Sequence, residues 1–255
     1  MSLLEVKNLT KTFGGLTAVD DLTFNIEKDE ILSLIGPNGA GKTTTFNMIT
    51  GFLNPDRGKI IFNDIDITSK EPHNIAELGL IRTFQKTNIF PDATVYENIK
   101  LAHFKSSKYS ILDILIRNKK FNKTEKRIKE KTNEIMEYFN LSEEKDKKAY
   151  NLAYGRKRIL EIAIGMAASP KLLLLDEPVA GLNPKESKEV MELIYDIRNK
   201  GITILLVEHD MSVVTNVSDR IVVINFGEKI CDGDCEYVTS DEEVIKAYLG
   251  DDIDA

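Results

Sequence analysis

The amino-acid sequence predicts an α/β protein with a parallel sheet, and two observations support that prediction. Two unbroken apolar runs, at residues 172–175 and 202–207, are typical of central parallel strands that are covered on both faces. Between them, residues 184–201 place apolar side chains at helical spacing and end at a glycine. A strand, a helix and a second strand in this order predict a parallel crossover unit.

Other strands are expected at both ends of the chain. Residues 3–9, 18–26 and 60–67 are rich in β-branched and large apolar residues and are bounded by Gly, Asn or Asp. We expect them to form an N-terminal antiparallel β subdomain. A last pair of strands is expected at 220–225 and 229–231, with a turn at 226–228.

The middle of the chain has helical periodicity, many charges and no strand-like run. Residues 119–131 hold seven Lys or Arg residues, which could form a polybasic patch for a membrane or a nucleic acid. We favour a solvated helical face, because Glu125, Glu130 and Glu134 are interleaved with the basic residues at the helical spacing that allows ion pairs. The sequence therefore predicts a single domain over 1–255, with a core and β subdomain at 1–94 and 166–255 and a helical subdomain at 95–165.

Composition limits the classes of function. The net charge of −7 argues against a general nucleic-acid binder and against recruitment to anionic lipid by bulk electrostatics. The sequence shows neither an apolar run of 18 residues nor a secretion signal, so we expect any membrane association to use a protein partner. Cys231 and Cys235 lack two further metal ligands nearby, which favours reduced thiols over a metal site.

The most specific motif is the phosphate-binding P-loop, residues 36–44, which reads Gly, four residues, Gly, Lys, Thr. A strand-like run precedes it and a helix-compatible segment follows, so a glycine-rich turn without a ligand is disfavoured. Backbone N–H groups of such a loop wrap phosphates, Lys42 should reach the β- and γ-phosphates, and Thr43 should bind Mg²⁺. We therefore expect a nucleoside triphosphate to be held by Gly36, Pro37, Asn38, Gly39, Ala40, Gly41, Lys42, Thr43 and Thr44.

Three further groups follow predicted strands or turns. Asp176 ends an apolar strand and could hold Mg²⁺, while the next residue, Glu177, could act as general base toward water, although both could simply end a strand. His209 follows the next strand, at the sheet edge where ligands collect. Residues 151–159 contain a small turn that opens another helix, a second candidate anion site that would serve a nucleotide held by another copy of the fold.

Together these motifs make the chain resemble the ATP-binding subunits of ABC transporters along essentially its whole length. The motifs are the P-loop, Gln85, the hallmark loop (residues 152–156), the strand at 172–177, the loop at 180–183 and His209. The resemblance implies the ABC ATPase fold, with ATP and Mg²⁺ as cofactors. It also implies that Gln85 joins Glu177 and His209 in catalysis and Thr43 and Asp176 in holding the metal. Phe13 falls where the family stacks an aromatic ring on adenine, although a buried strand-end Phe would look the same.

The resemblance further implies partners. Two ATP-binding subunits meet head to tail, each ATP lying between one P-loop and the other subunit's Ala153, Tyr154, Gly155 and Asn183. The partner ATPase is either a second copy or a homologue. In the family, residues around Gln85 and the helical insertion contact transmembrane permease subunits. The resemblance therefore implies that the chain lies peripherally at the cytoplasmic face of the inner membrane.

Finer likeness is to the ATPases of branched-chain amino-acid importers, which also use an extracytoplasmic solute-binding protein. It rests on residues 79–85, 152–155, 180–184 and 245–250. Ala153 replaces the usual Ser, Arg156 the commoner Gln and Asn183 the commoner Asp, and the first and last of these recur in that subgroup. The alternatives are an exporter ATPase, such as one for lipopolysaccharide extraction, and a soluble ABC protein acting on ribosomes or DNA.

Overall fold

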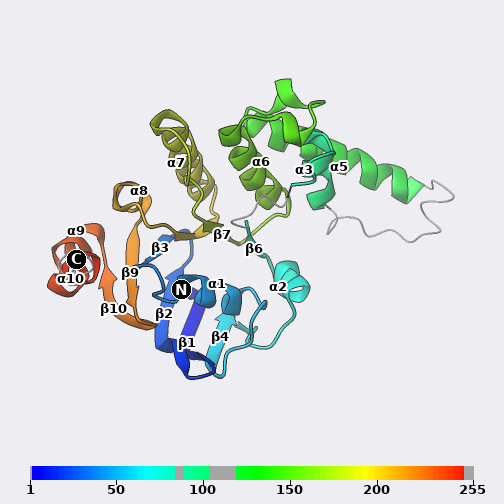
Figure 1. The fold of residues 1–255 in the computed structure, drawn as a ribbon. Helices are drawn as coiled ribbons and strands as arrows, with labels where there is room; N and C mark the ends of the chain where they lie inside the picture. Colours follow the sequence, from blue (N-terminus) through cyan, green and yellow to red (C-terminus); the bar gives the residue numbers. More distant parts are fainter. Residues whose placement is uncertain (1, 84–88, 104–118, 250–255) are drawn as a thin grey trace. The chain divides into compact units, whose positions relative to one another are not determined.

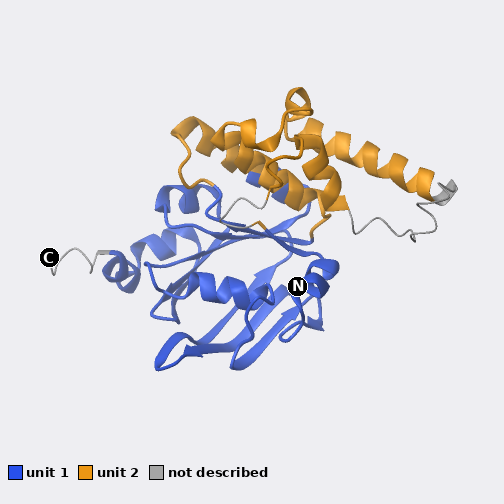
Figure 2. Cartoon of the chain, turned by 45° about the vertical axis from the view of Figure 1, so that its right-hand side comes forward, with its two compact units in different colours: residues 1–82, 171–178, 194–255 blue, residues 83–170, 179–193 orange. Residues whose placement is uncertain are grey.

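The computed structural model describes residues 2–83, 89–103 and 119–249 (Figure 1). The chain forms two compact units (Figure 2). Unit 1 comprises residues 1–82, 171–178 and 194–255, and unit 2 comprises residues 83–170 and 179–193. Unit 2 includes the region expected to form a helical subdomain, and the subdomain boundaries given above stay a prediction.

Sheet A of unit 1 is antiparallel, as predicted, in the order β2-β1-β4-β5. Its strands are β1 (Ser2–Phe13), β2 (Leu16–Glu27), β4 (Arg57–Phe62) and β5 (Ile65–Asp66). The single strand expected at 60–67 is wrong, because this segment is a hairpin. Asn63 and Asp64 have φ of 48° and 64°, the left-handed conformation that a tight hairpin turn requires at both central positions.

Sheet B has the order β10-β9-β3-β8-β7-β6. The strands from β9 to β6 are parallel and β10 is antiparallel to β9. The bounds are β3 (Ile31–Ile35), β6 (Leu80–Arg82), β7 (Leu172–Asp176), β8 (Thr203–Val207), β9 (Arg220–Asn225) and β10 (Glu228–Gly233). The central parallel strands predicted from the apolar runs are confirmed, and every residue of β3, β7 and β8 is buried. The three-residue strand β6 was not predicted.

Both faces of sheet B are covered within unit 1. On one face, Val222 and Ile224 of β9 belong to the core that contains Phe46 of α1 (Lys42–Ile49) and the apolar side chains of sheet A. On the other face, Ile221 and Val223 share a core with α8 (Met211–Val217), α9 (Cys235–Ser240) and α10 (Glu242–Leu249). This alternation along β9 follows the two-residue period of a strand. The remaining helix in the described part of this unit is α2 (Pro72–Leu78), and neither α2 nor α8, α9 and α10 was predicted.

Unit 2 is helical in its described part. It contains α3 (Val95–Ala102), α5 (Lys119–Tyr138), α6 (Tyr154–Ala167) and the short 3₁₀ turns η2 (Ser142–Glu144) and η3 (Ala149–Asn151). Helix α7 (Pro184–Asn199) begins in unit 2 and ends in unit 1. Helix α5 buries Ile128 and Met136 and exposes many of its charges, as expected of a solvated face. None of the helices in the described residues is long and apolar enough to cross a membrane.

The buried parallel strands predict a large stability effect. Leu205 of β8 has no exposed surface and belongs to the core beneath sheet A, so Leu205→Ala should lower the free energy of unfolding by about 2–5 kcal/mol. Urea unfolding measures this as a lower midpoint at unchanged slope. Ile65→Ala, at a side chain 37% exposed, is the control and should cost much less. Equal losses in the two variants would contradict the assignment of β8 to the core.

Candidate functional site

The P-loop connects β3 to α1 in unit 1 (Figure 1). Its path brings backbone atoms so close together that two positions require glycine. A Cβ on Gly36 (φ 155°) would lie 2.0 Å from the carbonyl oxygen of Ile224, and one on Gly41 (φ 102°) would lie 2.4 Å from that of Ala18. The loop is therefore held between β9 on one side and β2 on the other.

The P-loop presents positive charge and backbone donors. Lys42 Nζ donates to the carbonyl oxygens of Gly36 at 2.5 Å and Pro37 at 2.8 Å, so the ammonium group lies over its own loop. Burial lowers the pKa of Lys42, an effect that the charges of Glu177 and Asp176 oppose. Helix α1 has no side-chain cap and no acidic residue in its first turn, as befits a helix start that receives an anion.

The two predicted carboxylates end β7 beside the P-loop lysine. Asp176 is 5% exposed, and its Oδ2 forms an ion pair with Arg82 Nη2 at 2.9 Å. Glu177 has φ of 47°, unusual for a residue with a long side chain, and its N–H donates to the carbonyl oxygen of Val207 at 2.9 Å. Backbone strain of this kind is concentrated at functional sites, because the surrounding structure must impose it.

The structure brings His209 next to Glu177. Nδ1 of His209 lies 3.7 Å from Oε1 of Glu177, and the imidazole is 60% exposed, so it is accessible to a ligand. Phe13, at the end of β1, is 48% exposed, which excludes the alternative of a buried strand-end ring. Gln85 lies outside the described residues.

The hallmark loop lies in unit 2, where its side chains contact their own chain. Ala153 is the N-cap of α6 and supplies no side-chain cap, because it lacks the hydroxyl of serine. Tyr154 Oη donates to the carbonyl oxygen of Ala180 at 3.2 Å and accepts from Arg158 at 3.0 Å. A Cβ on Gly155 would lie 2.7 Å from Glu186 of α7.

Arg156 and Asn183 also have structural partners. Arg156 Nε pairs with Glu144 at 2.7 Å, and its guanidinium also binds Glu189 and the carbonyl oxygen of Asn140. Asn183 Oδ1 accepts from the N–H groups of Lys185 and Glu186, so this residue caps the start of α7. These contacts fix the two loops within unit 2.

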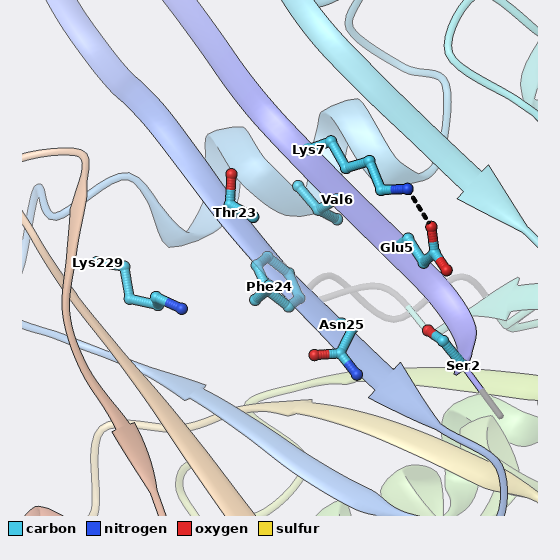
Figure 3. A pocket seen from close by; sticks show the side chains of 8 residues that line it. All are labelled: Ser2, Glu5, Val6, Lys7, Thr23, Phe24, Asn25 and Lys229. Atoms are coloured by element: carbon cyan, nitrogen blue, oxygen red, sulfur yellow. Dashed lines mark ion pairs between the residues drawn. The ribbon is translucent and has the colours of Figure 1, made fainter.

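Two other features lie apart from these motifs. Cys231 is buried and Cys235 is half-buried, both are free thiols, and burial raises the pKa of Cys231. A groove of about 260 Å³ lies over β1 and β2, where Lys229 extends from β10 toward Phe24 and Asn25 (Figure 3). No residue that the sequence predicts for the site lines this groove. The sequence alone assigned no role to Arg82, although this residue lies within the segment 79–85 on which the likeness to branched-chain importer ATPases rests.

Comparison with known proteins gives the same assignment. The family model described as "ABC transporter" matches residues 19–180. The chain is 43% identical over 250 residues to the high-affinity branched-chain amino acid transport ATP-binding protein LivG of Escherichia coli strain K12, with 98% of each chain covered. It is 36% identical over 251 residues to the lipopolysaccharide export system ATP-binding protein LptB of Haemophilus influenzae, again with 98% of each covered.

Among solved structures, a nucleotide-free ATP-binding cassette from an ABC transporter superposes with a TM-score of 0.85 at 34% identity, covering 98% of this chain and all of that one. The chain therefore belongs to the ABC transporter family. Its fold is that of an ABC ATPase and its activity class is ATP hydrolysis, as the motifs predicted.

The lowered pKa of Lys42 predicts proton uptake on ATP binding. The negative phosphate groups of ATP should raise this pKa again, so ATP should bind with uptake of protons. At pH values just below the ordinary lysine value of 10.5, ATP affinity should therefore fall as pH rises. Calorimetry in two buffers of different ionisation enthalpy detects the uptake. Lys42→Arg, which stays charged throughout, is the control and should abolish it. Identical heats for the native protein in both buffers would contradict the prediction.

Proposed function

We propose that this chain is the ATP-binding subunit of an importer for branched-chain or related amino acids. The assignment of the hydrolytic residues rests on one observation. Asp176 and Glu177 lie close enough to Lys42 in unit 1 for their charges to oppose the fall in the pKa of the lysine. The choice of solute rests on the greater similarity to LivG, at 43% identity, than to LptB, at 36%. An exporter ATPase is therefore the weaker candidate.

ATP would be bound by its phosphates in the P-loop and by its adenine ring against Phe13. Thr43 and Asp176, with Gln85, would hold Mg²⁺. A hydroxyl and carboxylate oxygens are the hard donors that this ion takes, so the described part of the donor set fits. When bound, the ion would neutralise charge on the phosphate oxygens.

Glu177 would take the proton of the attacking water, as general base. The positive φ of Glu177 and the hydrogen bond from its N–H to the carbonyl oxygen of Val207 fix the backbone from which the side chain extends. His209 lies near enough to orient the carboxylate. Lys42 would stabilise the charge on the phosphate groups.

The second half of each ATP site would come from another ATP-binding subunit, a copy or a homologue. Ala153, Tyr154, Gly155 and Asn183 would face the nucleotide held by that subunit. Transmembrane permease subunits would bind the chain at the cytoplasmic face of the membrane, and a solute-binding protein would act on the other side. With a net charge of −7, we expect no nucleic-acid partner.

The solute is tested by transport. The tagged chain, co-expressed with the permease subunits of a branched-chain amino-acid importer, should co-purify with them. The complex should support ATP-dependent uptake of radiolabelled leucine, isoleucine or valine in vesicles supplied with the binding protein. A complex carrying Lys42→Ala is the control for ATP dependence. Co-purification with lipopolysaccharide-export components, without amino-acid uptake, would favour the exporter instead.

Substitution of Glu177 tests the chemistry. Glu177→Gln keeps the shape of the side chain but removes its basicity, so ATP hydrolysis should fall by roughly 10²–10⁴. ATP affinity should not fall, because a negative charge next to the γ-phosphate is lost. Size-exclusion chromatography with Mg²⁺-ATP, with and without the partner ATPase, should show the variant as an ATP-bound dimer. Near-normal hydrolysis would move the role of general base to another group, with His209→Ala as the next variant.

A further inference from the structure

Arg82 is a charged residue with a nearly buried side chain, and the activity described above gives it no role. It ends β6, its side chain is 8% exposed, and its Nη2 donates to Asp176 Oδ2 at 2.9 Å. The carboxylate is also buried, so this is an ion pair largely removed from water. Such a pair needs good geometry and further hydrogen bonds to be tolerated.

The other arm of the guanidinium is fixed by α1, the helix that follows the P-loop. Nη1 donates to Asn47 Oδ1 at 2.7 Å, and the guanidinium carbon lies 5.4 Å from the ring centroid of Phe46. Arg82 therefore connects the phosphate-binding helix to the carboxylate at the end of β7, entirely within unit 1. A planar fork with two fixed directions suits this task, and a lysine ammonium would not reproduce it.

The contact has a consequence for metal binding. Because Oδ2 of Asp176 accepts from Arg82, the carboxylate is held in one orientation, and Oδ1 makes no hydrogen bond to any residue that the structure describes. Partners of this kind orient a ligand before the ion arrives, and their loss weakens metal binding. We propose that Arg82 is a positioning residue for the metal site: held by Asn47, it orients Asp176 so that Oδ1 is presented to Mg²⁺. This inference rests on the proposed role of Asp176.

The test measures binding of a fluorescent ATP analogue by the full chain, first in EDTA and then across a Mg²⁺ titration. Arg82→Met should leave affinity in EDTA nearly unchanged and raise the Mg²⁺ concentration for half-maximal effect by about tenfold, the range for loss of a ligand's supporting partner. Arg82→Lys should behave similarly, because it keeps the charge but not the fork.

Asn47→Ala keeps the ion pair and suits a helix, so it should fold even if Arg82→Met does not; it should shift the Mg²⁺ dependence in the same direction by a smaller factor. Arg198→Met is the matched control, because it removes an ion pair with Asp219 elsewhere in unit 1. An unchanged or lower Mg²⁺ requirement in the Arg82 and Asn47 variants would overturn the inference. A native-like Mg²⁺ requirement in Arg82→Lys would also overturn it, because positive charge alone, without the planar fork, would then be enough.

Asp176→Asn separates this inference from the proposed function. It should raise the Mg²⁺ requirement by itself, and Arg82→Met added to it should cause no further shift, because the two residues act as one unit. If Asp176→Asn shifts the requirement and Arg82→Met does not, the inference alone fails. If Asp176→Asn has no effect, the metal role of Asp176 fails, and the inference fails with it.

Discussion

The site depends on the register of the three central parallel strands. Leu34 of β3 and Asp176 of β7 are both paired with Val207 of β8, so the three strands reach their carboxyl ends at the same level. The P-loop, the two carboxylates and His209 each follow one of these ends and are therefore collected at one edge of the sheet. A shift of one strand by one residue would move the group that follows it by about 3.3 Å and would exchange the side chains that face the two sides of the sheet.

Sheet A contributes to the same site through backbone contacts. The N–H of Gly227, in the turn between β9 and β10, donates to the carbonyl oxygen of Ala40 at 3.1 Å, and the N–H of Asp20 in β2 donates to that of Gly227 at 2.9 Å. With the close approach of Ala18 to Gly41, these bonds fix the outer side of the P-loop. Sheet A therefore has two roles at the site. Its backbone contacts hold the P-loop in shape, and its strand β1 ends at Phe13.

Much of this could be predicted from sequence, and the failures have physical causes. The central strands were predictable because burial on both faces requires a run of apolar residues. The P-loop was predictable because phosphate binding requires Gly, Lys and Thr at fixed spacing. The hairpin at Asn63–Asp64 was missed because the apolar residues on both sides were taken as one strand, although Asn and Asp are turn-forming residues. Strand β6 was missed because three residues are too short to show a period. Arg82 could not be assigned, since its partner lies 94 residues away in sequence and only the fold brings the two together.

The departures in the hallmark loop become understandable from unit 2. Arg156 joins the start of α6 to Glu144 and Glu189, and the Tyr154 hydroxyl joins it to the loop before α7, so these contacts hold the hallmark loop in place. With Ala153 at the N-cap, no side chain occupies the first N–H groups of α6. In the proposed dimer, those N–H groups and the helix dipole would bind the partner's phosphate, in place of a serine hydroxyl. Backbone N–H groups cannot rotate toward a ligand as a serine hydroxyl can. Side-chain contacts that hold the loop rigid would therefore keep these donors in position for the phosphate.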